Sequence, residues 1–402
     1  MTASDDLPLA GVRIIEISSF VAVPLAGMTL AQLGAEVIRV DPVGGAADYK
    51  RWPLTDAGDS IYWAGLNKSK RSVAADMRSE EGQQLVARLI AEAGVLITNV
   101  AGRQWHSYEE LSAQRPDLIH LEVVGRHDGS TGVDYTVNAA TGFPLVTGSP
   151  AQGGPVNHVL PAWDVSCGLY AALAILVALR RRDATGAGSR IRLPLDDVAL
   201  ATAANLGFLT EPMVNGTQRP RLGNAIYGQY GQEFTSSDGA TFMLVALTNR
   251  HFKDLAALTG TTKAVAAVGE ALGADFTDEG QRYEHRAVLG GLFAPWFKTH
   301  TAQEVTAALS ASSVLWERYL DFAEVAQDPR VTANPLFTTL TQPRIGSYLA
   351  PGLPMSVDGA HVAALPAPAL GDDTAAVLTE LGLTADEIAG LVESGTVTTG
   401  TA

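Results

Sequence analysis

The sequence has little of what stabilises or anchors proteins outside the cytosol. Cys167 is its only cysteine among 402 residues, which excludes an intrachain disulfide framework and a cysteine-rich metal site. The first residues, MTASDDLP, lack the apolar run of a signal peptide. The longest apolar stretch, residues 168–179, is too short to span a bilayer. We therefore expect a cytoplasmic protein that has no membrane partner.

Positive charge is also scarce. The chain has 28 Lys and Arg residues against 43 Asp and Glu residues, and its formal net charge is −15. A negative overall field argues against a nucleic-acid partner, and an anionic ligand then needs local basic residues. The eight histidines are scattered and form no metal-binding motif. We expect no metal.

Glycine is missing from the first turn where a nucleotide site would need it. The apolar run 12–17 predicts a strand, residues 24–33 a helix, and residues 36–40 a second strand, which together form a βαβ unit. The turn between the first strand and the helix, residues 18–24 (SSFVAVP), contains no glycine. Dinucleotide sites need glycine there so that the backbone can approach the pyrophosphate. A Rossmann-like dehydrogenase is therefore disfavoured.

The alternation of helices and strands continues, with helices near 80–92 and 108–115 before strands at 95–98 and 118–124. This pattern predicts a doubly wound α/β domain with its ligand at the carboxyl ends of the strands. Residues 129–161 are expected to be a long ordered loop. The expected domains are a large α/β domain that begins in 1–220, a small α+β domain at 221–320, and an extended return segment, 321–402, that completes the large domain. The tail from Gly395 is expected to fray.

Asp164 stands at the start of an apolar helix, where an ionised carboxylate is unusual. The spacing of Leu169, Leu173, Leu176 and Leu179 predicts a helix that is buried on most of its circumference. The aspartate is either an N-cap or a nucleophile that free N–H groups keep ionised in a dry site. The residues alone leave both readings open. His158 is likewise either a loop histidine or a substrate contact.

Several basic residues follow or end predicted strands. Arg39 ends the second strand, and Arg103 and Arg126 follow later strands, while Lys68, Lys70 and Arg71 lie in residues 66–73 (LNKSKRSV). Any one of them is explained as solvated surface charge. As a set in an acidic protein, they suit a polyanionic ligand such as a phosphorylated nucleotide.

Six ordered features carry a family resemblance: residues 9–16 (LAGVRIIE), 24–39 (PLAGMTLAQLGAEVIR), 66–73, 96–99 (LITN), Asp164 before its helix, and the turn 185–188 (TGAG). With these features the chain resembles the class III CoA-transferases, the carnitine- and formyl-CoA-transferase-like family. The resemblance implies a Rossmann-like large domain with a smaller α+β domain, and ring-shaped monomers in an interlocked homodimer. It implies that Asp164 is the nucleophile and that coenzyme A enters only as part of the substrate. The CoA contacts it implies are Arg39, Asn67, Lys68, Lys70, Arg71, Asn99, Arg103 and Arg126.

Racemases of the same family need a histidine that follows a glycine upstream of the aspartate. Here residues 132–135 read GVDY, so Val133 replaces that histidine. Racemisation needs two bases on opposite faces of one carbon, and one of them is missing. The 2-methylacyl-CoA racemase reading is therefore disfavoured.

A narrower resemblance involves residues 20–29, 41–45, 48–53, 133–138 and 156–164. These stretches are similar to a subgroup of isomerases that move CoA between the two carboxyls of mesaconyl-CoA. Lys50, Arg51 or His158 could hold the second carboxylate, and the sequence does not choose among them. The alternatives are an intermolecular acyl-CoA:carboxylate CoA-transferase and a non-catalytic acyl-CoA-binding relative, against which the presence of Asp164 speaks.

Overall fold

The computed structural model describes residues 7–100, 104–357 and 359–400. The chain forms two compact units. Unit 1 comprises Met1–Ala140, His158–Asn205 and Gln327–Ala402, and unit 2 comprises Thr141–Asn157 and Leu206–Ala326. Residues 141–157 and 206–220 therefore belong to unit 2, the smaller of the two. The expected domain boundaries at 220 and 320 stay a prediction.

Unit 1 is built on a seven-stranded sheet in the order β14-β3-β2-β1-β4-β5-β6. All neighbouring strands are parallel except β14, which runs antiparallel to β3. This is the expected doubly wound fold, and the prediction is confirmed. The order reverses between β1 and β4, and at such a switch point open α/β sheets bind their ligands. The strands are β1 (Arg13–Ile17), β2 (Glu36–Asp41), β3 (Arg71–Ala75), β4 (Val95–Thr98), β5 (Ile119–Val124), β6 (Ser189–Pro194) and β14 (Val397–Thr398).

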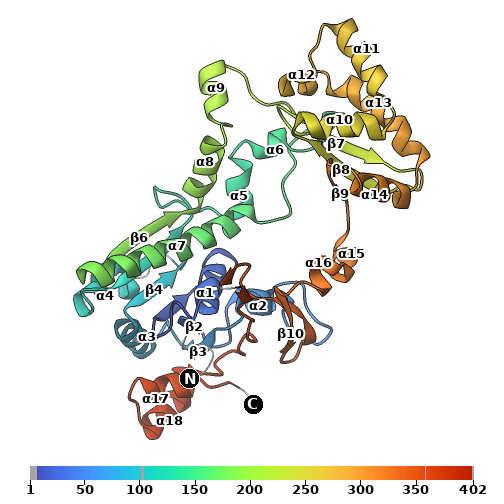
Figure 1. Ribbon diagram of the computed structural model, residues 1–402. Helices are drawn as coiled ribbons and strands as arrows, with labels where there is room; N and C mark the ends of the chain where they lie inside the picture. Colours follow the sequence, from blue (N-terminus) through green and yellow to red (C-terminus); the bar gives the residue numbers. More distant parts are fainter. Residues whose placement is uncertain (1–6, 101–103, 358, 401–402) are drawn as a thin grey trace. The chain divides into compact units, whose positions relative to one another are not determined.

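Helices cover the sheet of unit 1 (Figure 1). The helices of unit 1 are α1 (Ala22–Gln32), η1 (Ala47–Lys50), α2 (Ile61–Leu66), α3 (Glu80–Ala93), η2 (Gln104–His106), α4 (Tyr108–Gln114), α5 (Asp134–Ala139), α7 (Ala162–Thr185), α8 (Leu195–Asn205), α16 (Pro329–Thr332), α17 (Thr374–Glu380) and α18 (Ala385–Glu393). Small antiparallel pairs are β10 (Phe337–Gln342) with β11 (Gly346–Pro351), and β12 (Ser356–Val357) with β13 (Ala360–His361).

The two faces of the sheet differ in polarity because side chains alternate along a strand. On one face Ile15 and Ile38 pack with side chains of α3, α4, α17 and α18 in an apolar cluster. On the other face the neighbouring residues Glu16 and Arg39 lie opposite each other in the β1–β2 register. Both are fully buried. A pair of opposite charges is therefore buried on this face of the sheet in unit 1.

Helices α1 and α7 lie side by side (Figure 1). Gly168 permits the close approach, since a Cβ atom there would lie 2.6 Å from the carbonyl oxygen of Ala22. A contact of that length is forbidden for a carbon atom, so the crossing requires glycine. The crossing brings the start of α7 beside the start of α1.

Helix α7 is long and apolar enough to cross a membrane by length and composition alone, which is weak evidence because core helices pass the same test. Its buried stripe includes Trp163, Cys167, Ala171 and Ile175. The expected burial of Leu169 and Leu173 is wrong for the single chain. Four apolar side chains form an exposed stripe: Leu169, Tyr170 and Leu173 are each 53% exposed and Val177 is 61% exposed.

Three other expectations are corrected. The return segment is not wholly extended, because it contains α17 and α18 and their apolar side chains join the core. The expected frayed tail pairs with the sheet, where Val397 and Thr398 form β14 beside β3. The expected long loop contains α5 and, in unit 2, the short helix α6 (Phe143–Val146).

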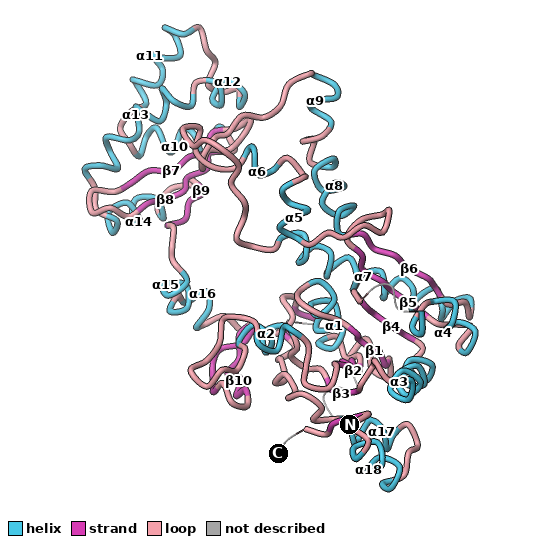
Figure 2. Tube along the Cα trace, turned by 180° about the vertical axis from the view of Figure 1, so that it is seen from behind, coloured by secondary structure: helices cyan, strands magenta, loops and turns pink. Residues whose placement is uncertain are grey.

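Unit 2 has the expected α+β character. Its antiparallel sheet, drawn in magenta in Figure 2, has the order β7-β8-β9. Aromatic side chains dominate the core, among them Tyr230, Phe242, Phe293 and Phe297. The remaining elements are β7 (Tyr230–Thr235), β8 (Thr241–Ala246), β9 (Leu315–Arg318), α9 (Thr210–Asn215), α10 (Asn249–Leu258), α11 (Thr262–Leu272), α12 (Glu279–Glu284), α13 (Arg286–Thr299), α14 (Ala302–Ser310) and α15 (Phe322–Gln327), which ends at the boundary of the unit.

Candidate active site

The loop between β1 and α1 is held in place by side chains rather than by glycines. The Asn99 side chain accepts from the N–H of Ser19 at 3.0 Å and donates to its carbonyl oxygen at 2.8 Å. The N–H of Phe20 donates to Asp48 at 3.2 Å. Phe20 has a φ of +67°, a backbone conformation that costs energy for a bulky residue. Because Asn99 follows β4, these bonds join the two strands that flank the switch point.

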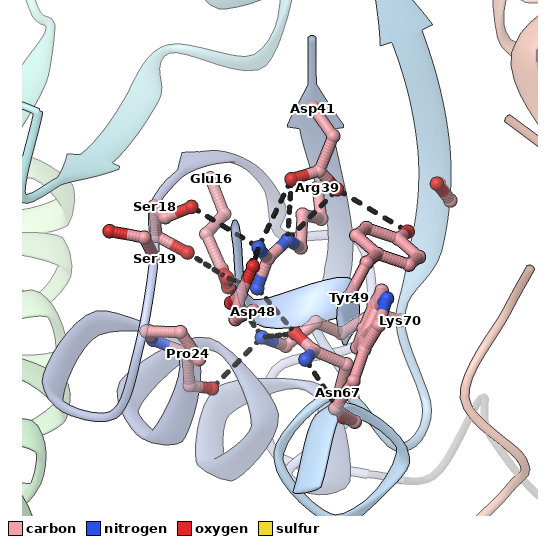
Figure 3. A network of polar contacts seen from close by, with 12 residues as sticks. Glu16, Ser18, Ser19, Pro24, Arg39, Asp41, Asp48, Tyr49, Asn67 and Lys70 are labelled. Atoms are coloured by element: carbon pink, nitrogen blue, oxygen red, sulfur yellow. Dashed lines mark hydrogen bonds and ion pairs between the residues drawn. The ribbon is translucent and has the colours of Figure 1, made fainter. Parts of the chain in front are cut away.

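A buried polar network lies under this loop (Figure 3). The Arg39 guanidinium donates to Asp41, Asp48 and Asn67, and it also donates to the carbonyl oxygen of Ser18 at 3.2 Å. Every nitrogen of its guanidinium thus has an acceptor inside the protein. The side chain is fully buried. Arg39 therefore acts as a structural cation that holds the loop.

Lys70 belongs to the same network. Its ammonium donates to Glu16, to Asn67 and to the carbonyl oxygen of Pro24, each at 2.8 or 2.9 Å. Burial lowers the pKa of Lys70 to about 8, although the charge of Glu16 opposes the shift. The three donors of the ammonium are all used. In this arrangement Lys70 has no donor left for a phosphate, and the guanidinium of Arg39 is buried and surrounded by acceptors of the protein.

The other expected CoA contacts are dispersed. Lys68 is buried and donates to the carbonyl oxygen of Gly65. Arg71 begins β3, so it lies at the amino end of that strand, and it pairs with Glu36, Asp373 and Glu380. Arg126 follows β5 and donates to the carbonyl oxygen of Thr131 at 2.8 Å. Arg103 lies outside the described residues. Direct CoA contact by this set stays a prediction.

A cavity of about 420 Å³ opens at the carboxyl ends of the strands that flank the switch point. Its lining includes Ser18 and Ser19 after β1, Val100 after β4, and Arg78 after β3. Arg78 is 85% exposed at its side chain, and its nearest carboxylate, Asp76, lies 3.5 Å away. The sequence analysis missed Arg78, although its position three residues after a predictable parallel strand was a usable signal.

Asp164 is the third residue of α7 and does not cap it. The cap is supplied by Asp134 of α5, whose Oδ2 accepts from the backbone N–H groups of Trp163 at 2.8 Å and Asp164 at 3.1 Å. The expectation that free N–H groups at the start of α7 serve the nucleophile is therefore wrong, because Asp134 occupies them. The sequence analysis missed this role of Asp134. Because Asp134 lies 30 positions before Asp164, no local pattern shows that it caps α7.

The electrostatics of Asp164 suit a reactive group. Burial, followed by the negative charge of Asp134, raises the pKa of Asp164 to about 6, while Arg51 opposes the shift. The carboxylate accepts no hydrogen bond from any residue in the described ranges 7–100, 104–357 and 359–400. An ionised carboxylate that is partly desolvated and lacks a donor is a competent nucleophile. The nearby Cys167 is fully buried, and burial raises the pKa of its thiol to about 12, so it stays protonated.

The structure separates the three candidate substrate residues. The ring of His158 places Nε2 3.1 Å from Oδ1 of Asp134. The Arg51 guanidinium lies over the rings of Phe20 and Tyr62, at 5.2 and 4.9 Å from their centroids. Lys50 lines a separate cavity of about 610 Å³ together with Trp63 and Arg344. Only Arg51 is both close to Asp164 and free of an acidic partner among the described residues.

Comparison with known proteins decides the family. The family model for CoA-transferase family III matches residues 9–374. The chain belongs to this family. It is 46% identical to the 2-methylfumaryl-CoA isomerase of Chloroflexus aurantiacus over 97% of each chain, and 28% identical to the succinyl-CoA–D-citramalate CoA-transferase of the same organism over 95% of this chain and 96% of that one. The solved CAIB/BAIF family protein from Brucella suis superposes with a TM-score of 0.79 at 27% identity, covering 93% of this chain and 99% of that one.

The resemblance to class III CoA-transferases is thus confirmed, and the chain is an enzyme of this family. Within the described residues no group of three or more His, Cys, Asp and Glu side chains is arranged to hold a metal ion. The expected absence of a metal stays a prediction.

Replacing Asp164 distinguishes a reactive carboxylate from a cap. In the unfolded chain the pKa of Asp164 is about 4, whereas in the folded chain it is about 6. The folded state therefore binds more protons between these values, and stability falls as pH rises through them. We expect Asp164→Asn to raise the melting temperature at pH about 7.5 and to change it little at pH about 4. The exposed control Asp56→Asn should show no such pH-dependent gain. A capping role, which asparagine fills about as well as aspartate, predicts no pH-dependent gain for Asp164→Asn.

Proposed function

We propose that this enzyme transfers CoA within one molecule, between the two carboxyls of mesaconyl-CoA, and thus acts as a 2-methylfumaryl-CoA isomerase. The 46% identity to the isomerase of Chloroflexus aurantiacus over nearly the whole chain supports this activity. The observation that carries the mechanism is the Asp164 carboxylate, which is partly buried, has a raised pKa and is released from capping by Asp134.

The transfer requires four exchanges at acyl carbons and no proton transfer. An Asp164 oxygen attacks the thioester carbonyl, the C–S bond breaks, and the sulfur leaves with the electron pair as CoA thiolate. The thiolate then attacks the Asp164 carbonyl of the mixed anhydride, which frees mesaconate and leaves CoA on Asp164 as a thioester. The other carboxylate of mesaconate attacks this thioester and releases the thiolate again. The thiolate finally attacks the mesaconyl carbonyl, which yields the isomeric thioester and restores the Asp164 carboxylate. Exclusion of water protects both intermediates.

An intermolecular CoA-transferase with a separate acid acceptor is the second candidate. It is supported by the family itself and by the 28% identity to a succinyl-CoA–D-citramalate CoA-transferase. The chemical steps at Asp164 would be the same. The two activities differ only in whether the freed acid leaves before it reacts again.

We place the CoA nucleotide in the switch-point cavity of about 420 Å³. Open α/β sheets bind ligands there, and Arg78 provides an exposed guanidinium for a phosphate. Asn99, Arg103 and Arg126 follow strands whose carboxyl ends face that side of the sheet, so they remain proposed contacts. Arg39, Asn67 and Lys70 support the site indirectly, because they hold the loop that lines it.

We also propose that the enzyme is a homodimer in the cytoplasm and that the exposed stripe of α7 belongs to the dimer interface. The family resemblance implies an interlocked dimer. Four apolar side chains on one face of a helix, each more than half exposed, are typical of a surface that another chain covers.

The activity is tested with mesaconyl-CoA as the only substrate. We expect the wild-type enzyme to interconvert the two thioesters without added acid, and isotopically labelled free mesaconate to stay out of the product, because the bound acid reacts faster than it leaves. Asp164→Ala should abolish turnover while keeping the dimer, and hydroxylamine should trap the wild-type acyl intermediate. Chromatographic separation of the thioesters measures both results. Rapid incorporation of label, or efficient transfer to succinate, would support the intermolecular candidate instead.

The nucleotide site is tested by Arg78→Ala. Loss of one phosphate contact should raise the KM for acyl-CoA roughly 10-fold without changing kcat, and it should make KM less sensitive to salt. Arg330→Ala is the matched control, since Arg330 is also an exposed arginine two residues after an aspartate with which it pairs. Equal KM values for the two variants would remove Arg78 from the site.

The interface is tested by Leu173→Arg, which places a charge in the middle of the exposed stripe. We expect sedimentation velocity to show a shift from dimer to monomer, because an unpaired charge at the centre of an apolar interface is strongly unfavourable. The control Leu272→Arg changes a leucine on α11 that is 48% exposed. A dimer that tolerates Leu173→Arg as well as the control would exclude the stripe from the interface.

A further inference from the structure

We propose that Arg51 is the carboxylate clamp of the active site, the residue that holds the free carboxylate of a dicarboxylyl-CoA substrate and so selects dicarboxylic over monocarboxylic acyl groups. The proposal rests on the proposed function, since it places the acyl group at Asp164. It adds a specificity-determining residue, with a defined ligand chemistry, to the transfer mechanism.

Arg51 is an arginine without an acidic partner in a protein rich in carboxylates. The chain has 43 acidic and 28 basic side chains, and the neighbouring cation Arg39 is surrounded by acids. By contrast, no carboxylate within residues 7–100, 104–357 and 359–400 forms an ion pair with Arg51. Its side chain is exposed, so its planar fork of N–H donors is accessible. A carboxylate is the ligand that matches this fork in charge and geometry.

Two aromatic rings orient the guanidinium. Its carbon lies 5.2 Å from the centroid of the Phe20 ring and 4.9 Å from that of Tyr62. Phe20 is held in its unusual backbone conformation by the bond from its N–H to Asp48, so this ring belongs to the anchored loop. Contacts to the faces of both rings restrict the long arginine side chain and leave its edge for hydrogen bonds. The clamp is therefore partly ordered before substrate binds.

The position of Arg51 matches the need of the reaction. Its guanidinium lies over Phe20, just before the start of α1, and the close crossing at Gly168 brings this start beside the first turns of α7, which carry Asp164. The charge of Arg51 also acts on the Asp164 carboxylate, while no ion pair joins the two groups. A small dicarboxylate bound between them would place one carboxyl at Asp164 and the other at Arg51. When the freed acid turns end for end, the same guanidinium can release one carboxylate and take the other. One clamp therefore serves both directions of the isomerisation.

The other two candidate cations are less suited. Lys50, the residue before Arg51, lines the separate cavity beside Trp63 and Arg344. The Nε2 atom of His158 is engaged with Asp134, the residue that caps α7. A substrate carboxylate at His158 would have to compete with that buried aspartate. The structure thus selects one of the three residues that the sequence left open.

The test compares mesaconyl-CoA with 2-methylcrotonyl-CoA, in which a methyl group replaces the free carboxylate. Hydroxylamine-dependent release of CoA thiol measures formation of the Asp164 anhydride for either thioester. The assay is run at pH about 8.5, well above the raised pKa of Asp164, so that changes in its ionisation do not contribute. The variants are Arg51→Met, Arg51→Lys and, as the competing candidate one residue away, Lys50→Met. Circular dichroism and sedimentation confirm that each variant is folded.

We expect Arg51→Met to lower kcat/KM for mesaconyl-CoA roughly 10- to 100-fold, which corresponds to the loss of a charged hydrogen-bonded pair. The value for 2-methylcrotonyl-CoA should not change. Arg51→Lys should restore part of the loss, because it keeps the charge without the fork. Lys50→Met should discriminate between the thioesters as the wild type does. In Arg51→Met, labelled free mesaconate should enter the product, since the freed acid is no longer retained.

Equal losses on both thioesters in Arg51→Met, or an equal loss of discrimination in Lys50→Met, would overturn the clamp and leave the transfer mechanism standing. Failure of the proposed function has a different signature. Asp164→Ala would then release thiol from mesaconyl-CoA as fast as the wild type does, which would overturn the mechanism and the role of Arg51 within it.

Discussion

The buried guanidinium of Arg39 is the interaction on which the site of this enzyme depends. It joins the end of β2 to the β1–α1 loop, to η1 through Asp48 and to the residue after α2, Asn67. Removing the guanidinium would leave the buried carboxylates of Asp41 and Asp48 without their cation, and breaking a buried ion pair in this way costs about 3–5 kcal/mol. The network also constrains the backbone around it. At Gly27 a Cβ atom would lie 1.8 Å from the Glu16 carboxylate, so only glycine leaves room for that side chain.

This network explains how a βα turn without glycine can line a ligand cavity. A glycine-rich turn reaches its conformation because it has no Cβ atoms. Here Asn99 and Asp48 bond the backbone of Ser19 and Phe20 directly and hold the loop in a strained form. The strain is offset by buried hydrogen bonds. The consequence is a rigid loop that presents both the cavity lining and the Phe20 ring under Arg51.

Asp134 of α5 and Asp164 of α7 divide two tasks between them: one caps the start of α7, and the other keeps a carboxylate free. Asp134 satisfies the helix N–H groups, so Asp164 carries no capping bond. Burial and, after it, the negative charge of Asp134 raise the pKa of Asp164, which makes the proposed nucleophile more basic. A helix terminus capped from another element can therefore keep its own first-turn carboxylate available for chemistry.

Much of the fold followed from local patterns. The strands around 12–17, 36–40, 95–98 and 118–124 were predictable because each is a short apolar run between turn signals, and buried parallel strands have this form. Helices α17 and α18 and strand β14 were missed because prolines dominate the segment before them. The exposure of Leu169 and Leu173 was missed because hydrophobicity alone does not tell whether the same chain or another chain covers a helix.

The sequence by itself determined the family and the parallel sheet and singled out Asp164 as the candidate nucleophile, because these rest on local periodicity and on motifs in fixed order. Tertiary structure decided what each cation does. In the sequence alone, Arg39, Lys70 and Arg51 are simply three positively charged side chains whose roles cannot be told apart. Arg39 and Lys70 both lie against Glu16, which a separate strand brings to them, whereas Arg51 has no acidic partner among the described residues. A charge that is neutralised inside the protein supports the fold, while an unpaired charge is free for a ligand, and only long-range contacts determine which it is.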